Sequence, residues 1–140
     1  MSTSDHPVAR VLDAELAAKM GVVVTAVATD CVVEEIPTAT NIQPFGLLHG
    51  GANAFLVEDA GSRLAIVNCP ENKLTVGTEL NISHLAPNRT RLARATARPI
   101  RISQSSAVVN VDIHDENGVL TATGRLTCVY ITSSSRQPAQ

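Results

Sequence analysis

Residues 41–68 read NIQPFGLLHGGANAFLVEDAGSRLAIVN, and this stretch determines the architecture of the chain. Its first part is loop-like, because Pro44 blocks regular strand pairing and the adjacent Gly50 and Gly51 have no Cβ. From residue 52 onwards, small and aliphatic residues dominate and no proline occurs. This pattern predicts a helix that is apolar on nearly every side and is therefore buried at the centre of the fold.

The predicted helix carries two adjacent carboxylates, Glu58 and Asp59, which a buried helix should not hold without a reason. At about 100° per residue, Asp59 lies on the same side as Arg63, and an acid four residues before a base is the favourable order. Glu58 has no such partner, and its stripe of the helix also holds Gly51, Phe55 and Ser62. We interpret Asp59 as structural and Glu58 as functional; the alternative is a carboxylate that neighbouring backbone or solvent satisfies.

The beginning of this helix has a chemistry of its own. The first N–H groups of a helix lack intrahelical partners and carry partial positive charge, and glycines allow a ligand to approach them closely. Such groups stabilise a carbonyl oxygen that becomes an oxyanion. Gly50 and Gly51 alone also fit a tight turn into the helix. Their combination with polar side chains nearby indicates a reaction at a carbonyl group; these side chains are His49, Glu58 and Ser62.

The composition indicates one globular domain over residues 1–140, with flexible tails at 1–8 and 133–140. A net charge of -2 does not favour nucleic acid or a membrane surface, and 2% aromatic residues argue against platforms for base stacking. No apolar run is long enough to span a bilayer, and no signal peptide is recognisable. The odd, unpatterned set of three cysteines predicts buried thiols in a reducing cytoplasm; they are Cys31, Cys69 and Cys128.

Outside the central stretch, the pattern predicts a short helix and five strands. The helix spans 11–20, and the strands span 22–36, 74–84, 90–102, 107–114 and 119–131. Alternation in the second strand predicts one apolar face formed by Leu74, Val76, Leu80 and Ile82. An antiparallel β-sheet that covers one apolar helix is an α+β hotdog fold, with the sheet wrapped around a long central α-helix. The face and edge that stay uncovered favour oligomers.

The run NIQPFGLLHGGANAFLVEDAGS resembles the active-site segment of the hotdog acyl-CoA thioesterases. It is similar to the branch that includes 4-hydroxybenzoyl-CoA and 1,4-dihydroxy-2-naphthoyl-CoA thioesterases, with the PaaI-like enzymes of phenylacetate pathways as broader relatives. The resemblance is specific over this run and looser over most of residues 20–132. There, VGTELNISH and DENGVLTATGRLT are similar to later strands of the branch.

The resemblance implies a role for each residue of the motif. Glu58 would be the catalytic carboxylate, as nucleophile or general base, and the Gly50 backbone N–H would polarise the thioester carbonyl. Gln43 and His49 would help to place the thioester, and Ser62 would position the attacking water or the carboxylate. This hydrolysis needs no metal and no cofactor, since coenzyme A is part of the substrate.

Residues 99–106, PIRISQSS, depart from that branch, where relatives tend to have His, Gly and Arg near the CoA nucleotide. The arginines at 89–101 suit phosphate geometry and could bind CoA; the alternative is a solvated strand face. The thioester could instead be carried by the phosphopantetheine of a carrier protein. The remaining candidates for substrate binding are Asn41, Gly51, Phe55, Arg94, Arg98, Arg101 and Ser106.

The four histidines are scattered without the spacing of metal ligands, so no metal site is predicted. Among them, His84 and His114 are interpreted as members of polar strand faces. We expect hydrolysis of acyl-CoA to the free acid and CoA, with aromatic or arylacetyl acyl groups preferred. A non-catalytic hotdog module that binds acyl-CoA is the alternative.

Helix geometry adds a prediction about assembly. Gly50 and Glu58 are separated by roughly 12 Å along a helix axis at about 1.5 Å per residue. A Glu side chain leans toward the N-terminus but recovers only about a third of that distance. One helix therefore cannot bring both groups to one carbonyl, whereas two antiparallel helices about a two-fold axis can. We expect a homodimer with shared active sites, and the resemblance implies a dimer of dimers.

Overall fold

The computed structural model describes residues 14–133. It contains two helices, α2 (Glu15–Met20) and α3 (Gly50–Val67), and six strands. The strands are β1 (Val23–Ala28), β2 (Cys31–Pro37), β3 (Lys73–His84), β4 (Leu92–Ile102), β5 (Ser106–Asp115) and β6 (Leu120–Thr132). The predicted tails, except for Ser133, and the first residues of the predicted helix 11–20 lie outside the described residues.

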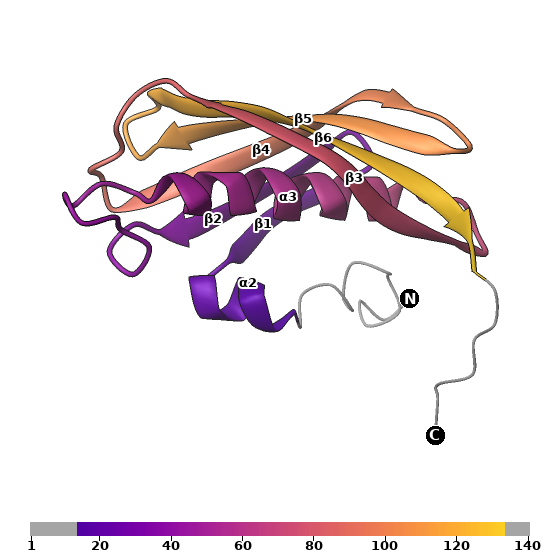
Figure 1. Ribbon diagram of the computed structural model, residues 1–140, viewed down its shortest axis with the longest axis horizontal. Coiled ribbons are helices and arrows are strands. Elements are labelled where there is room, and N and C mark those ends of the chain that lie inside the picture. Colours follow the sequence, from indigo (N-terminus) through magenta and orange to yellow (C-terminus); the bar gives the residue numbers. More distant parts are fainter. Residues whose placement is uncertain (1–13, 134–140) are drawn as a thin grey trace.

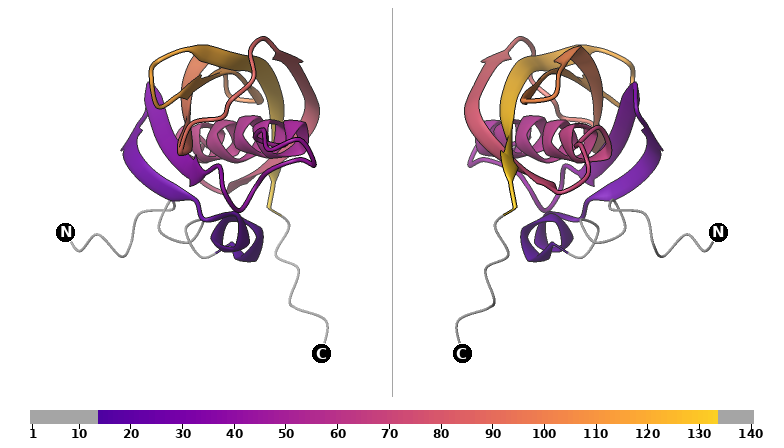
Figure 2. Two further views of the ribbon diagram at one scale, coloured as in Figure 1. Left: turned by 90° about the vertical axis from the view of Figure 1, so that its left-hand side faces the viewer. Right: turned by 90° about the vertical axis from the view of Figure 1, so that its right-hand side faces the viewer.

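The strands form one antiparallel sheet in the order β1-β2-β4-β5-β6-β3, and this sheet curls around α3 (Figures 1 and 2). The inward positions of β5 are fully buried against apolar positions of α3, among them Leu56 and Leu64. Burial of each such aliphatic side chain stabilises the fold by about 1.5–3 kcal/mol. The arrangement confirms the predicted α+β fold with one long central helix.

The prediction of a single strand over residues 22–36 is wrong. The structure has a hairpin there, in which β1 and β2 pair with Val23 opposite Glu35 and Ala28 opposite Cys31. Thr29 and Asp30 form the turn between them. Asp favours such turns because its side chain competes with regular pairing, but β-branched residues on both sides hid the break from the pattern.

The predicted single apolar face of β3 is also wrong, because a β-bulge lies between Gly77 and Glu79. On one side of the bulge, Leu80 pairs with the buried Leu126. On the other side, Leu74 pairs with the exposed Ile131, on the outer face of the sheet. The extra residue of a bulge reverses the alternation of faces. The apolar residues before and after it therefore point to opposite sides.

Helix α3 is not buried on every side, in contrast to the prediction. The edge strands β1 and β3 stand at opposite ends of the sheet order and leave one side of the helix uncovered. Gly51 and Glu58 are exposed on that side, whereas Leu56 and Val57 are fully buried. The stripe that carries Glu58 is therefore open to solvent in a single chain.

The three cysteines are free thiols, but only Cys128 is buried, so the expectation of three buried thiols holds for one of them. Burial, with the charge of Glu58 as a smaller cause, raises the pKa of the Cys128 thiol to about 11. Within residues 14–133, no helix has the length and hydropathy needed to cross a membrane. No metal-binding group of His, Cys, Asp and Glu side chains occurs there either.

Candidate active site

Helix α3 begins with an N-terminal cap made by His49, whose backbone is extended. The imidazole Nδ1 accepts a hydrogen bond of 2.7 Å from the Gly51 N–H, and the His49 carbonyl accepts from the N–H groups of Ala52 and Asn53. The Gly50 N–H has no acceptor among the described residues. The cap therefore satisfies the neighbouring donors and leaves the Gly50 N–H open at the positive end of the helix.

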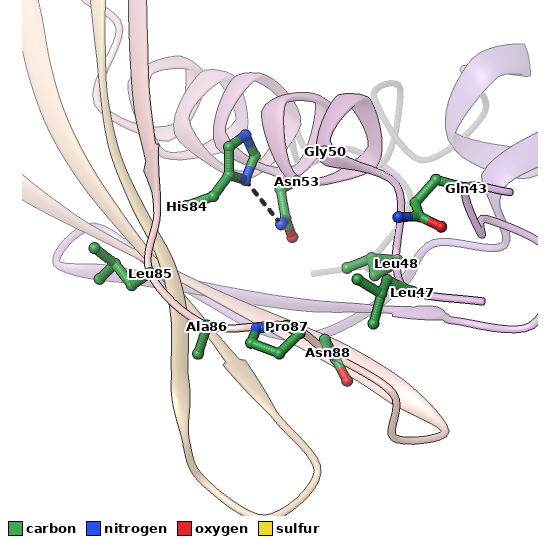
Figure 3. A pocket seen from close by; sticks show the side chains of 10 residues that line it. All are labelled: Gln43, Leu47, Leu48, Gly50, Asn53, His84, Leu85, Ala86, Pro87 and Asn88. Atoms are coloured by element: carbon green, nitrogen blue, oxygen red, sulfur yellow. Dashed lines mark hydrogen bonds between the residues drawn. The ribbon is translucent and has the colours of Figure 1, made fainter. Parts of the chain in front are cut away.

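The loop before the helix shapes the other side of this opening. A turn from Gln43 to Gly46, with Gly46 at φ 81, folds the loop back, and the Gln43 side-chain oxygen accepts a hydrogen bond from the Phe45 N–H. The Gln43 amide nitrogen then lies on the side of the cavity (Figure 3). Asn41 has a different position: its side chain donates to the carbonyls of Met20 and Pro37 and ties the loop to α2 and β2.

A cavity of about 370 Å³ lies in front of Gly50. Its polar lining residues are Gln43, Gly50, Asn53, His84 and Asn88, which come from the loop, the first turn of α3, the end of β3 and the following loop (Figure 3). Its apolar lining residues are Leu47, Leu48, Leu85, Ala86 and Pro87. A largely apolar wall with a few convergent polar groups is typical of a site for a small organic molecule.

His84 belongs to this cavity, and its interpretation as part of a polar strand face is wrong. A Cβ at Gly50 would lie only 3.2 Å from its Cε1 and 3.3 Å from its Nε2, so the glycine makes room for the ring. The amide nitrogen of Asn53 lies 3.3 Å from its Nδ1. A signal was present in the sequence: His84 follows Leu80 and Ile82 at the same alternation and so shares their face.

Glu58 and Ser62 lie together further along α3 and do not line the cavity. The Ser62 hydroxyl donates to Glu58 Oε1 over 3.4 Å. On β3, a Cβ at Gly77 would lie 3.1 Å from the same oxygen, so glycine at the bulge provides space for the carboxylate. Phe55 is half-buried on the same stripe. One chain therefore holds two separate groups: Gln43 and Gly50 at the cavity, and Glu58 with Ser62 beside the edge strand.

The arginines of the predicted CoA contact do not line the cavity. Arg94 is paired with Glu35 of β2, with Nε 2.7 Å from Oε1, and Arg98 and Arg101 are exposed. On β4 the fully buried positions are Ala93, Ala95 and Ala97. Arg94 and Arg98 therefore lie on the face turned away from α3. Ser106 is engaged in the turn between β4 and β5, where its hydroxyl lies 3.2 Å from that of Ser103.

The predicted pair of Asp59 and Arg63 is confirmed, at 2.8 Å from Nε to Oδ2. Sequence reasoning missed a third member, Glu34 of β2, whose Oε2 lies 3.0 Å from the same Nε. Glu34 and Arg63 are almost fully buried. Burial, followed by the charge of Asp59, raises the pKa of the Glu34 carboxyl to about 9, so Glu34 is neutral near pH 7. None of these three residues lines the cavity in front of Gly50.

Comparisons with known proteins identify the family of the chain. Residues 45–122 match the family described as the thioesterase superfamily. The chain is 36% identical over 112 residues to the proofreading thioesterase EntH of Klebsiella pneumoniae, covering 79% of this chain and 82% of that protein.

Two solved structures are also similar. A thioesterase from Haemophilus influenzae has a TM-score of 0.82 at 31% identity, covering 88% of this chain and 87% of that one. A variant of a thioesterase from Pseudomonas aeruginosa has a TM-score of 0.84 at 25% identity, covering 94% and 97%.

Proposed function

The chain belongs to the thioesterase superfamily and is a thioester hydrolase with the hotdog fold, and from this premise we propose that it hydrolyses acyl-CoA to the free acid and CoA. The proposed acyl groups are aromatic or arylacetyl. The observation that carries the proposal is the Gly50 N–H, which lies at a largely apolar cavity and has no acceptor among residues 14–133.

The chemistry follows from the groups around that N–H. A thioester carbonyl that accepts from the Gly50 N–H is polarised, and the negative charge that develops on its oxygen is stabilised by the helix terminus. The Gln43 amide lies on the same side of the cavity and can hold the carbonyl or the acyl group. Attack at the carbonyl carbon breaks the carbon–sulfur bond, and the thiolate of CoA leaves and takes up a proton.

Glu58 is the proposed source of the attack, either directly or through water. As a nucleophile, its carboxylate forms a mixed anhydride that water then hydrolyses; as a general base, it removes the proton from an attacking water. Single turnover in ¹⁸O-water tests the nucleophile. Label in the Glu58 side chain requires an anhydride that water splits at the Glu58 carbon. Label in the product acid alone is expected for the general base and also for an anhydride split at the acyl carbon, so it counts against the nucleophile only in the first form.

We propose that each complete site combines residues of two chains. In one chain, Glu58 is exposed on the uncovered side of α3 and outside the cavity that Gly50 lines. The adjacent β3 is an edge strand of 12 residues with the exposed apolar side chains Leu74, Val76 and Leu80. A long unpaired edge of this kind favours pairing with another chain. A two-fold partner with an antiparallel α3 would bring its Glu58 to this Gly50.

The assembly proposed is thus a homodimer, with a dimer of dimers as its extension. The cytoplasm is the proposed compartment, because all three cysteines are free thiols. The chemistry requires the pair of chains, and it needs neither the dimer of dimers nor the compartment.

The test is release of free thiol from a panel of thioesters. It includes benzoyl-, hydroxybenzoyl- and phenylacetyl-CoA, short- and long-chain acyl-CoA, and the same acyl groups on a carrier protein. We expect the aromatic CoA esters to react fastest and the Glu58→Gln variant to be nearly inactive. Faster turnover of carrier-protein thioesters would show that the substrate is carried by a protein and not by CoA. No CoA release above the buffer rate would refute the proposal.

A further inference from the structure

Asn53 is an unusual residue for its position, one turn into α3 and only 5% exposed. Asn is a poor helix former, and a buried amide is costly unless its groups are hydrogen-bonded. Its amide nitrogen lies 3.3 Å from His84 Nδ1, and its Oδ1 has no hydrogen-bond partner among the described residues (Figure 3). The side chain therefore lines the cavity and contacts His84 there, and packing alone does not account for it.

The contact determines where the proton of His84 lies. In the orientation that the structure gives the Asn53 amide, its nitrogen faces Nδ1 and donates to it, which places the single proton of a neutral imidazole on Nε2. This Nε2 lies beside Gly50, within 3.3 Å of the position that a Cβ would take there. His49 has the same tautomer, because its Nδ1 accepts from the Gly51 N–H.

We propose that Asn53 is a positioning residue that holds His84 in the Nε2–H tautomer, so that His84 supplies a second hydrogen-bond donor beside the Gly50 N–H. The inference rests on the proposed function, in which that N–H receives the thioester oxygen. A lone pair on Nε2 would repel the same oxygen, whereas an N–H strengthens its stabilisation. The opposite tautomer would therefore work against the helix terminus, and Asn53 excludes it.

Nitrogen NMR of the imidazole side chains tests the tautomer without any substrate. In mildly alkaline buffer, where imidazoles are neutral, we expect the His84 proton on Nε2. His84→Gln identifies the signal by its loss. In Asn53→Asp, the carboxylate accepts instead of donating, so the proton should move to Nδ1. Asn72→Asp makes the same change in an exposed turn at the other end of α3 and should leave the His84 signal unchanged.

Kinetics test whether the donor matters. The amide nitrogen of a glutamine can take the place of Nε2–H, so His84→Gln should keep the rate within about tenfold, whereas His84→Ala should lose about 10²-fold in kcat, as for other oxyanion donors. Asn53→Asp should lose a similar factor with little change in KM. In a His84→Gln background, Asn53→Asp should not lower kcat further, because the glutamine has no imidazole tautomer for Asn53 to control.

Three outcomes overturn the inference: a wild-type His84 proton on Nδ1, a His84→Gln variant as slow as His84→Ala, or equal losses from Asn53→Asp in both backgrounds. If Asn53→Asp does not fold, Asn53→Ala serves instead and should give a mixture of tautomers and a lower kcat. The NMR result also separates this inference from the proposed function. An Nε2–H tautomer in a protein that hydrolyses no thioester would leave the positioning role intact and refute the function.

Discussion

Two neighbouring carboxylates on α3 have opposite surroundings. Asp59 accepts a hydrogen bond of 2.8 Å from Arg63 and borders the buried Glu34, all within one chain. Glu58 is exposed, and within the described part of the chain its one hydrogen-bond partner is the Ser62 hydroxyl at 3.4 Å; Gly77 makes room for its carboxylate. A carboxylate that its own chain satisfies, such as Asp59, is structural, whereas one that is accommodated without an ion pair, such as Glu58, is available for chemistry.

The first turn of α3 shows the same contrast between two backbone donors. The Gly51 N–H is capped by His49, and the Gly50 N–H next to it stays without an acceptor among the described residues. The first N–H groups of a helix lack intrahelical partners, and the N–H of Gly50, which lines the cavity, is therefore available to a ligand. Open groups in the two regions, Gly50 and Glu58, are the ones assigned to the reaction.

The largest expected effect on kcat comes from removing the negative charge of Glu58, and the same change at Asp59 is its matched control. Glu58→Gln should keep the fold and lower kcat by about 10³-fold or more, which is about 4 kcal/mol of barrier. Asp59→Asn should stay within about tenfold of wild type in kcat, since Asp59 acts through Arg63 and not on the substrate. Steady-state thiol release from purified variants measures both. Equal losses would show that the comparison assigns the wrong carboxylate.

The next largest effect is recovery of activity in mixed dimers, which tests whether Gly50 of one chain acts with Glu58 of the other. Gln43→Ala and Glu58→Gln are each expected to be nearly inactive, and mixing them under conditions of subunit exchange should restore roughly a quarter of wild-type activity. Random pairing makes about half of the dimers mixed, and each mixed dimer has one native and one doubly altered site.

Mass spectrometry of differently labelled chains checks that exchange has occurred. Wild-type protein carried through the same exchange should keep its full activity. If mixed dimers form and the activity remains that of the parents, the two open groups do not share a site across the two-fold axis.

Local patterns predicted much of this fold. The alternation of Ala107, Val109, Val111 and Ile113 and the apolar run of α3 are properties of short segments, and the structure confirms both. The hairpin at residues 29–30 and the bulge at Gly77 were missed, because neither interrupts the apolar pattern strongly. A bulge changes which face a residue occupies without changing the sequence alternation.

The site residues also divide into those that a local motif predicted and those that sequence reasoning missed. Gln43 and Gly50 lie in one contiguous motif, and the structure places both at the cavity. His84 and Glu34 come from distant strands, and their contacts with α3 depend on how the sheet curls around the helix. Such pairings are set by tertiary packing, which periodicity within one segment does not contain.

The buried cluster of Glu34, Asp59 and Arg63 can be tested through the pH dependence of stability. Burial raises the pKa of Glu34 from its ordinary 4.5 to about 9, so the folded protein binds this proton more tightly than the unfolded chain. The stabilisation is therefore complete below about pH 4.5 and is lost as pH rises toward 9. Glu34→Gln should flatten this decline in the free energy of unfolding, measured with urea across the window.

Glu116→Gln is the matched control, because a hydrogen bond from Arg91 lowers the pKa of that exposed carboxyl. Its stabilising effect has the opposite sign, present at high pH and lost in acid. The control should therefore keep the decline toward alkaline pH. A decline as steep in Glu34→Gln as in wild type would show that Glu34 is not the titrating group.

The smallest expected effect is a change in KM on replacing the arginines of the outer face of β4. Arg94 is paired with Glu35, whereas Arg98 forms no ion pair with any residue from 14 to 133. If open groups are the functional ones, Arg98→Ala should raise KM for acyl-CoA by about threefold, the scale of one exposed charge contact, and Arg94→Ala should raise it less. Neither variant should change KM for acyl-pantetheine, which lacks the nucleotide phosphates. An unchanged KM for both substrates in both variants would show that these arginines belong to a solvated strand face and do not bind CoA. The contrast between paired and open groups would then hold for α3 alone.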